Sequence, residues 1–162
     1  MPFLSHDPLD LGALLAECSA SSRGGIASFV GLVRDHHDGR GVTALSYSAY
    51  EPMAERVGAE IVGEAERKWP VRVAIRHRLG DLAIGEMAVA VVVAGGHREE
   101  AFAACRYAIE EIKRRVPIWK LETYADGSTA WVDPTATQEL ASSEKRDQEV
   151  ASSEKREGSG IA

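Results

Sequence analysis

The chain has 162 residues, of which 44% are hydrophobic and 27% are charged. These ordinary values predict one globular domain and exclude collagen-like, wholly disordered and membrane-spanning proteins. A formal net charge of -6 argues against general binding to nucleic acids or anionic membranes. The first eight residues lack the basic and apolar regions of a secretory signal, and only two cysteines occur, Cys18 and Cys105. We therefore expect a cytoplasmic protein without a disulfide framework.

Hydrophobic periodicity predicts a series of helices and strands between residues 1 and 134. In chain order we expect a helix at 10–18, strands at 26–33 and 42–50, a helix from Pro52 to just before Trp69, strands at 71–79 and 87–94, a long helix that ends before Pro117, and a strand at 118–123. The strand at 26–33 is apolar on both faces, which is typical of a central strand. The turn at 38–41 predicts that this strand forms a hairpin with the strand at 42–50.

The two longer helices each carry an apolar stripe that we expect to be buried. The stripes are Met53, Val57, Ile61 and Ala65 in the first helix, and Phe102, Cys105, Ile109, Ile112 and Val116 in the second. The order of the elements indicates an α+β fold with a mixed or antiparallel sheet and helices on one face.

Composition changes sharply after Trp131. From Thr135 onward there is almost no large apolar residue, and the sequence ASSEKR at 141–146 recurs at 151–156. Such a segment cannot bury enough apolar surface to offset the entropy lost on ordering. We therefore expect one domain over residues 1–134, followed by a flexible, charged, low-complexity tail over residues 135–162.

Polar residues gather in the segment from Arg34 to Arg40, which holds two adjacent histidines flanked by aspartates. A solvated turn explains this composition, since loops are polar by default. Metal binding is the alternative, but neighbouring side chains seldom converge on one ion and no further cluster with zinc-like spacing occurs in the sequence. We therefore assign no metal site.

A second polar group lies at a predicted strand-to-helix junction, where Gly95 and Gly96 precede His97 and Arg98. Free backbone N–H groups and the positive end of the helix dipole suit such a junction to an anion. The guanidinium of Arg98 can add a bidentate contact to a phosphate. An ordinary glycine turn with an exposed first helical residue is the alternative.

Cations cluster around the predicted end of the long helix. Lys113, Arg114 and Arg115 lie in its last turn, where a positive charge stabilises the helix dipole, so capping alone explains them. Lys120 follows Pro117 on the next strand and has no such explanation. The reversal of the chain can bring the amines of Lys113 and Lys120 together. Such a pair favours an anionic substrate, and a lysine beside other cations can act as a nucleophile or general acid.

Six spaced motifs occur in order between about Gly24 and Trp131. They are Phe29-Val30-Gly31-Leu32-Val33-Arg34-Asp35-His36, Tyr50-Glu51-Pro52-Met53-Ala54, His77-Arg78-Leu79-Gly80, His97-Arg98, Cys105-Arg106-Tyr107, and Lys113 with Val116-Pro117-Ile118-Trp119-Lys120. Together they resemble the large, catalytic subunit of molybdopterin synthase. The resemblance implies an α/β hammerhead-like fold with a small additional antiparallel β subdomain. Leu121 stands where that family often has a second basic residue.

The same resemblance implies an activity and a partner. The reaction converts cyclic pyranopterin monophosphate into molybdopterin by building its dithiolene. Sulfur arrives as a thiocarboxylate on the C-terminal Gly-Gly of a small ubiquitin-like partner subunit. The assembly is a heterotetramer, with a central homodimer of large subunits and a small subunit at each end. No cofactor is expected.

Six residues of this chain match functional positions of the family, and their roles are implied by the resemblance. Phe29, Arg34, His97 and Arg98 are the expected substrate-binding residues, and Lys113 and Lys120 are the expected catalytic residues. The lysines would orient the thiocarboxylate, stabilise charge during sulfur transfer and assist opening of the cyclic phosphate. Cys105 lies on the apolar stripe of its helix, and we interpret it as a core residue.

Helix geometry constrains how these residues meet. Arg98 and Lys113 are fifteen residues apart on one predicted helix, so their backbones are separated by about 22 Å. Long side chains and a substrate can bridge part of that gap. A simpler solution, which we expect, is that His97 and Arg98 complete the active site of the other protomer in a homodimer.

Two alternatives from other classes remain. A noncatalytic, dimeric anion-binding or nucleotide-binding regulatory domain would explain His97 and Arg98, but it gives no reason for Lys120. RNA binding through residues 113–115 is opposed by the net charge and by the lack of an RNP-like aromatic motif.

Overall fold

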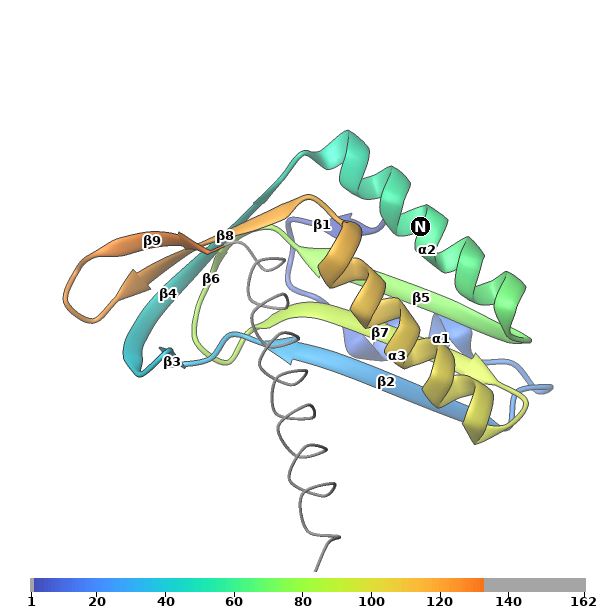
Figure 1. The fold of residues 1–162 in the computed structure, drawn as a ribbon. Coiled ribbons are helices and arrows are strands. Elements are labelled where there is room, and N and C mark those ends of the chain that lie inside the picture. Colours follow the sequence, from blue (N-terminus) through green and yellow to red (C-terminus); the bar gives the residue numbers. More distant parts are fainter. Residues whose placement is uncertain (1, 133–162) are drawn as a thin grey trace, which may run out of the picture. The chain divides into compact units, whose positions relative to one another are not determined.

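The computed structural model describes residues 2–132, and the predicted boundary at residue 134 and the segment 135–162 lie outside the described residues. In chain order the elements are β1 (Leu4–Ser5), α1 (Leu11–Cys18), β2 (Gly25–Leu32), β3 (His36–His37), β4 (Arg40–Ala49), α2 (Glu51–Lys68), β5 (Val71–Arg78), β6 (Gly80–Leu82), β7 (Met87–Gly95), α3 (Arg98–Arg115), β8 (Ile118–Tyr124) and β9 (Thr129–Val132) (Figure 1). No helix between residues 2 and 132 is both long and apolar enough to cross a membrane.

The larger sheet has the strand order β1-β5-β7-β2. The short β1 runs parallel to β5, while β7 runs antiparallel to both β5 and β2. Residues 88–95 of β7 are all buried, which explains why this strand is an unbroken apolar run in the sequence.

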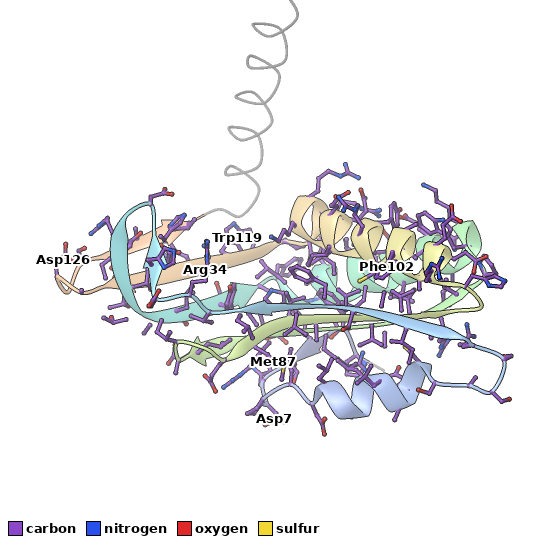
Figure 2. The ribbon with its side chains drawn as sticks, turned by 90° about the horizontal axis from the view of Figure 1, so that it is seen from below. Asp7, Arg34, Met87, Phe102, Trp119 and Asp126 are labelled. Atoms are coloured by element: carbon purple, nitrogen blue, oxygen red, sulfur yellow. The ribbon has the colours of Figure 1, made fainter. Side chains whose placement is uncertain are left out.

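Helices cover both faces of this sheet. Val89, Val91 and Val93 of β7 pack in the core formed with α2 and α3. The alternate residues of the strand, including Ala90 and Val92, pack with α1 on the other face. Figure 2 shows α1 on the opposite side of the sheet from α2 and α3. The expectation of helices on one face is therefore correct for α2 and α3 and wrong for α1, because β7 is apolar on both faces.

The smaller sheet is wholly antiparallel. Its path is β3-β4-β8-β9, and β6 pairs with the remaining part of the β4 edge. Figure 1 shows these strands projecting beyond the C-terminal end of α3, with β8 leading directly out of that helix. This sheet confirms the small antiparallel β subdomain and, with the mixed larger sheet, the α+β class.

The hairpin expected between residues 26–33 and 42–50 is wrong. β2 pairs with β7, and β4 pairs mainly with β8. The turn residues Asp38 and Gly39, with φ of 48° and 76°, instead join β4 to the two-residue strand β3. β2 is also an edge strand and not a central one, and its apolar residues at the edge stay exposed.

The helix stripes are predicted correctly except at their N-terminal ends. Met53 is 40% exposed and Phe102 is 65% exposed, whereas the neighbouring Ala54 and Ala101 are buried. In each helix small alanines face the sheet and allow a close approach of the backbones. Because the alanine faces the sheet, the larger side chain next to it in the sequence, Met53 or Phe102, points to solvent.

Candidate active site

The face of β8 that carries Lys120 holds an unusual buried carboxylate. Alternation along the strand places Lys120, Glu122 and Tyr124 on the same face. The Lys120 ammonium donates to Glu122 Oε1 at 2.9 Å, and the side chains are 18% and 2% exposed. Since charged groups this deeply buried are costly unless paired, the contact fixes the amine of Lys120 at a defined position.

The other oxygen of Glu122 accepts two further hydrogen bonds. His37 donates from Nδ1 at 2.7 Å, and the Tyr124 hydroxyl donates at 2.8 Å. Burial alone would raise the pKa of Glu122, but the hydrogen bonds from Lys120, Tyr124 and His37 outweigh it and hold that pKa below its usual value. The carboxylate is therefore ionised at neutral pH and accepts hydrogen bonds from Lys120, His37 and Tyr124.

Tyr47 is a partly buried tyrosine on the strand next to Lys120. It lies opposite Lys120 on the neighbouring strand β4. Burial raises the pKa of Tyr47, the charge of Glu122 raises it further, and the guanidinium of Arg34 opposes them. Arg34 is exposed in the connection between β2 and β3 and forms no ion pair within residues 2–132. Figure 2 shows Arg34 and Trp119, a residue of β8, at the side of the smaller sheet nearer to α3.

The cations in the last turn of α3 differ in their surroundings. Arg115 is paired with Glu64 at 2.6 Å and with Glu111 at 3.2 Å, and Arg114 also pairs with Glu111. Lys113 is exposed and has no ion-pair partner among the described residues. The two arginines thus stabilise the helix end, while the charge of Lys113 is available to a ligand.

Phe29 lies on β2, five residues before Arg34. It is opposite Val91, on the face of the sheet covered by α3, and 36% of its surface is exposed. A Cβ atom at Gly31 would meet Val89 Cγ1 at 2.7 Å and lie 3.6 Å from the Phe29 ring, so only glycine fits beside this ring. The Phe29 ring is therefore packed beside Gly31 on β2, the strand that leads to Arg34.

His97 and Arg98 lie at the other end of the molecule's long helix. His97 is the residue before α3, and its backbone N–H donates to Glu100 Oε2 at 3.3 Å. Arg98 packs beside Gly25, at the start of β2, and is exposed. Lys113 lies in the last turn of α3 and Lys120 lies on β8, which follows it, whereas His97 and Arg98 lie at the opposite end of α3 (Figure 1).

Sequence reasoning missed three residues of this arrangement, Tyr47, Glu122 and Tyr124, and gave His37 no partner. The spacing of Lys120, Glu122 and Tyr124, each two apart on a predicted strand, is the signal that identifies a shared face. By the same alternation Leu121 points to the opposite face. The basic residue that it replaces would therefore not lie beside Lys120.

Both cysteines of the chain are core residues. Cys18 and Cys105 are free and buried, and burial raises the pKa of both thiols. The interpretation of Cys105 as a core residue is confirmed. Within residues 2–132, no three His, Cys, Asp or Glu side chains gather as they would around a metal ion.

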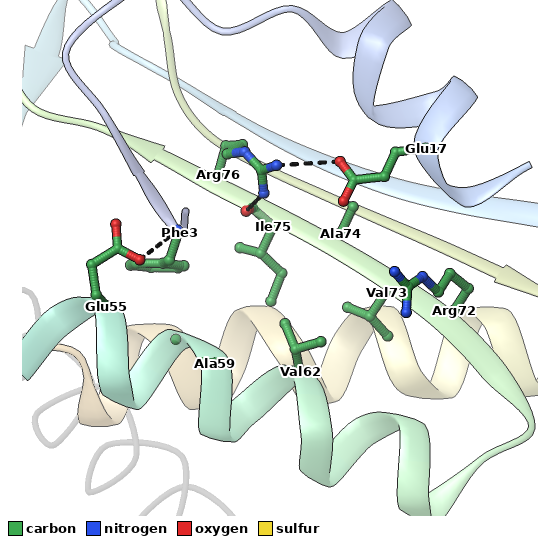
Figure 3. A pocket seen from close by; sticks show the side chains of 11 residues that line it. Phe3, Glu17, Glu55, Ala59, Val62, Arg72, Val73, Ala74, Ile75 and Arg76 are labelled. Carbon is green, nitrogen blue, oxygen red and sulfur yellow. Dashed lines mark hydrogen bonds and ion pairs between the residues drawn. The ribbon is translucent and has the colours of Figure 1, made fainter. Parts of the chain in front are cut away.

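A pocket of about 170 Å³ lies elsewhere, beside the edge of β5 (Figure 3). Its charged side chains are satisfied internally: Glu17 pairs with Arg76 at 3.2 Å, and Glu55 accepts the backbone N–H of Phe3 at 2.7 Å. None of the six predicted site residues lines it. We therefore place the candidate site at the junction of α3 and β8.

Comparisons with known proteins give the family. The sequence profile of the MoaE protein family matches residues 4–115. The molybdopterin synthase catalytic subunit of Nostoc sp. is 44% identical over 138 residues, which cover 84% of each protein. Molybdopterin synthase from Staphylococcus aureus has a similar structure, with a TM-score of 0.77 and 36% identity over 81% of this chain and 96% of that chain. A protein-protein complex of subunits 1 and 2 of molybdopterin-converting factor from Helicobacter pylori contains a similar chain, with a TM-score of 0.67 and 27% identity over 80% of this chain and 88% of that one. The chain therefore belongs to the family of molybdopterin synthase catalytic subunits, enzymes of molybdenum cofactor biosynthesis.

Proposed function

We propose that the chain builds the dithiolene of molybdopterin on cyclic pyranopterin monophosphate, with sulfur from the C-terminal thiocarboxylate of a small ubiquitin-like partner. The observation that carries this proposal is the Lys120 amine held 2.9 Å from the buried carboxylate of Glu122, at the end of α3 where Lys113 has no described ion-pair partner. An acidic chain that gathers cations at one place is suited to an anionic substrate and an anionic sulfur donor.

Each residue has a role that follows from its charge and place. Arg34 binds the cyclic phosphate or the pterin, and Phe29 offers an aromatic face beside it. Lys113 and Lys120 orient the thiocarboxylate and stabilise the negative charge that develops as sulfur is transferred. Lys113 or Lys120 also assists opening of the cyclic phosphate as a proton donor. A dithiolene holds two sulfur atoms, and each thiocarboxylate carries one. Two thiocarboxylate-bearing partner molecules must therefore each give up a sulfur atom for every molecule of product.

The assembly that fits these roles is a heterotetramer with two copies of this chain at its centre. The Helicobacter pylori structure is a complex of two different subunits, which supports a separate small partner here. Within the central homodimer, His97 and Arg98 of one copy reach the site formed by Lys113 and Lys120 of the other. We place the reaction in the cytoplasm, where the two free cysteines suit a reducing compartment.

A single-turnover assay tests the proposal. The chain is mixed with cyclic pyranopterin monophosphate and a partner that ends in the thiocarboxylate, and the sulfur-containing pterin is detected by mass spectrometry. The matched control is the same partner with an ordinary C-terminal carboxylate, which has no sulfur to give. We expect product only with the thiocarboxylate. A folded chain that yields none with either partner would favour a regulatory anion-binding domain instead.

A further inference from the structure

We propose that His37 is a positioning residue for Lys120 and acts through the buried carboxylate of Glu122. This inference rests on the proposed function, in which the Lys120 amine meets the sulfur donor. His37 itself touches neither the substrate nor the partner in that scheme. Its effect is transmitted by two consecutive hydrogen bonds, from His37 to Glu122 and from Lys120 to the same carboxylate.

The geometry of Glu122 makes this transmission direct. His37 Nδ1 lies 2.7 Å from Oε2 and Lys120 Nζ lies 2.9 Å from Oε1, so one planar carboxylate links the two side chains. The glutamate is 2% exposed and His37 is 15% exposed, so little water is available to replace a lost donor. Tyr124 is the only other described donor to this carboxylate, and it shares Oε2 with His37. Two donors on one oxygen fix the plane of the carboxylate and aim the other oxygen at Lys120.

His37 is itself held in place by a tight hairpin. The two residues that follow it, Asp38 and Gly39, have positive φ and turn the chain into β4, so His37 lies opposite Arg40. The guanidinium of Arg40 lies 3.6 Å from the centre of the Tyr124 ring. It also pairs with Asp126 at 3.1 Å, in the turn between β8 and β9. Through these contacts of Arg40, the hairpin that carries His37 is held against β8, the strand that carries Lys120.

Other charged groups face this network from each neighbouring element. Asp38 Oδ2 is 3.7 Å from His37 Nε2 but is exposed to solvent. Tyr47 lies on β4 opposite Lys120, and the charges of Glu122 and Arg34 shift its pKa in opposite directions. None of these groups is a described hydrogen-bond partner of Glu122, so they do not replace the contact that His37 makes.

This arrangement also ties the two sides of the site together. Arg34 and His37 belong to the same short connection between β2 and β4, while Lys120 belongs to β8. The hydrogen bond from His37 to Glu122 therefore sets the distance between the loop with the predicted phosphate ligand and the strand with the predicted sulfur-orienting amine. Small errors in such placement reduce rates strongly, since reacting groups must meet within a few tenths of an ångström.

Two substitutions separate positioning from mere folding. His37→Leu fills the space but removes the donor, which leaves Tyr124 as the sole donor to Oε2 and lets the carboxylate turn. His37→Asn places an amide N–H close to the position of Nδ1 and restores the donor. We expect His37→Leu to lower the single-turnover rate at saturating substrate by about tenfold with partner affinity unchanged, and His37→Asn to recover it to within about twofold.

A readout independent of activity follows the order of the Lys120 side chain. In protein labelled with ¹³C-lysine, the two Hε protons of Lys120 have different chemical shifts when the amine is held, and Lys120→Arg assigns the signal. We expect the two shifts to merge in His37→Leu and to stay apart in His37→Asn. His36→Leu is the matched control, because His36 is 65% exposed and pairs with Asp35 instead of Glu122. It leaves the Lys120 signal unchanged.

The outcomes are distinct. The proposal is overturned if His37→Leu keeps both the Lys120 signal and the rate of the natural chain, or if His37→Asn is as slow as His37→Leu. If the natural chain makes no product at all, the proposed function fails, and the Lys120 signal alone then decides whether His37 orders that side chain.

Discussion

Arg98 begins α3 and Lys113 lies in its last turn, so about 22 Å of helix separates the two residues in one chain. The helix is continuous from Arg98 to Arg115, and no bend brings its ends together. The proposed site shared between protomers rests on this separation, because it lets Arg98 of one copy meet Lys113 of the other.

Mixed dimers test the shared site. A dimer of one Lys113→Ala chain and one Arg98→Ala chain has one site with both defects and one site with neither. Random mixing makes half of the dimers mixed, and each mixed dimer has one intact site out of two. We therefore expect about a quarter of the natural activity from two nearly inactive parents. The measurement is the conversion rate after the two variants are unfolded and refolded together. Mixtures that stay as inactive as each parent rule out the shared site.

Gly58 in α2 allows the ring of Phe3, the residue before β1, to pack closely against the helix. A Cβ atom at Gly58 would collide with the ring of Phe3, so Gly58→Ala must displace that ring. We expect a loss of about 1–3 kcal/mol in the free energy of unfolding, even though alanine favours helix. Gly63→Ala in the same helix is the control, because its Cβ would meet only the flexible end of Arg67. Urea unfolding measures both, and equal stability of the two variants contradicts the packing.

Burial of His77 predicts a pH dependence of stability. Burial lowers the pKa of His77 to about 4, against a weak opposing hydrogen bond to the Arg78 carbonyl. The unfolded chain binds this proton near pH 6.5, so stability is full above that pH and is lost as pH falls toward 4. The loss from this group approaches about 3 kcal/mol.

His77→Phe isolates this contribution, because the ring site between Phe3 and Tyr47 accepts an aromatic side chain. Urea midpoints measured from pH 7.5 to 4.5 should fall less steeply for His77→Phe than for the natural chain. Parallel curves for the two proteins would show that His77 is not the buried neutral group described.

The ion pair between Glu64 and Arg115 predicts a further loss of stability, at a lower pH than that of His77. The hydrogen bond from Arg115 is the main cause of a Glu64 pKa of about 2, with a second bond from Tyr107. Because this pKa is depressed, the stabilisation is full above about pH 4.5 and disappears as pH falls through 2. Both side chains are partly exposed, so we expect Glu64→Gln to cost only about 1 kcal/mol at pH 7.

Glu60→Gln is the control for that variant, since Glu60 lies 3.4 Å from Arg115 and is half exposed. Thermal unfolding at pH 7 and pH 3 should show a deficit for Glu64→Gln that narrows at the lower pH, and little effect of Glu60→Gln. An equal deficit at both pH values contradicts the assigned ion pair.

Local signals in the sequence predict most of the fold. The apolar run of β7, the alternation in β5 and the Pro117 stop after α3 all act within a few residues, and the structure confirms these elements. The pairing of β2 with β7 joins segments about 60 residues apart, and no local signal carries it. A tight turn at residues 38–41 therefore indicated the wrong partner for β2, although the turn itself is present in the shorter β3–β4 hairpin.

The candidate site also has parts that the sequence predicts and parts that it does not. Motif order identifies the six predicted residues, and helix length alone separates Arg98 from Lys113. The contact between His37 and Glu122 could not be assigned from the motifs, because the two residues are 85 positions apart and meet only when β4 pairs with β8. Pairing of distant strands, which composition does not encode, creates this part of the site.

The most direct test of the central claim compares single-turnover conversion by the natural chain with that by Lys113→Ala and Lys120→Ala. Lys68→Ala is the control, because Lys68 lies over the rings of Trp69 and Tyr107, away from Lys120. With partner binding intact, we expect both site variants to be about 100-fold slower and Lys68→Ala to match the natural chain. Lys113→Ala and Lys120→Ala chains that convert substrate at the natural rate would contradict the claim that sulfur is transferred at the junction of α3 and β8.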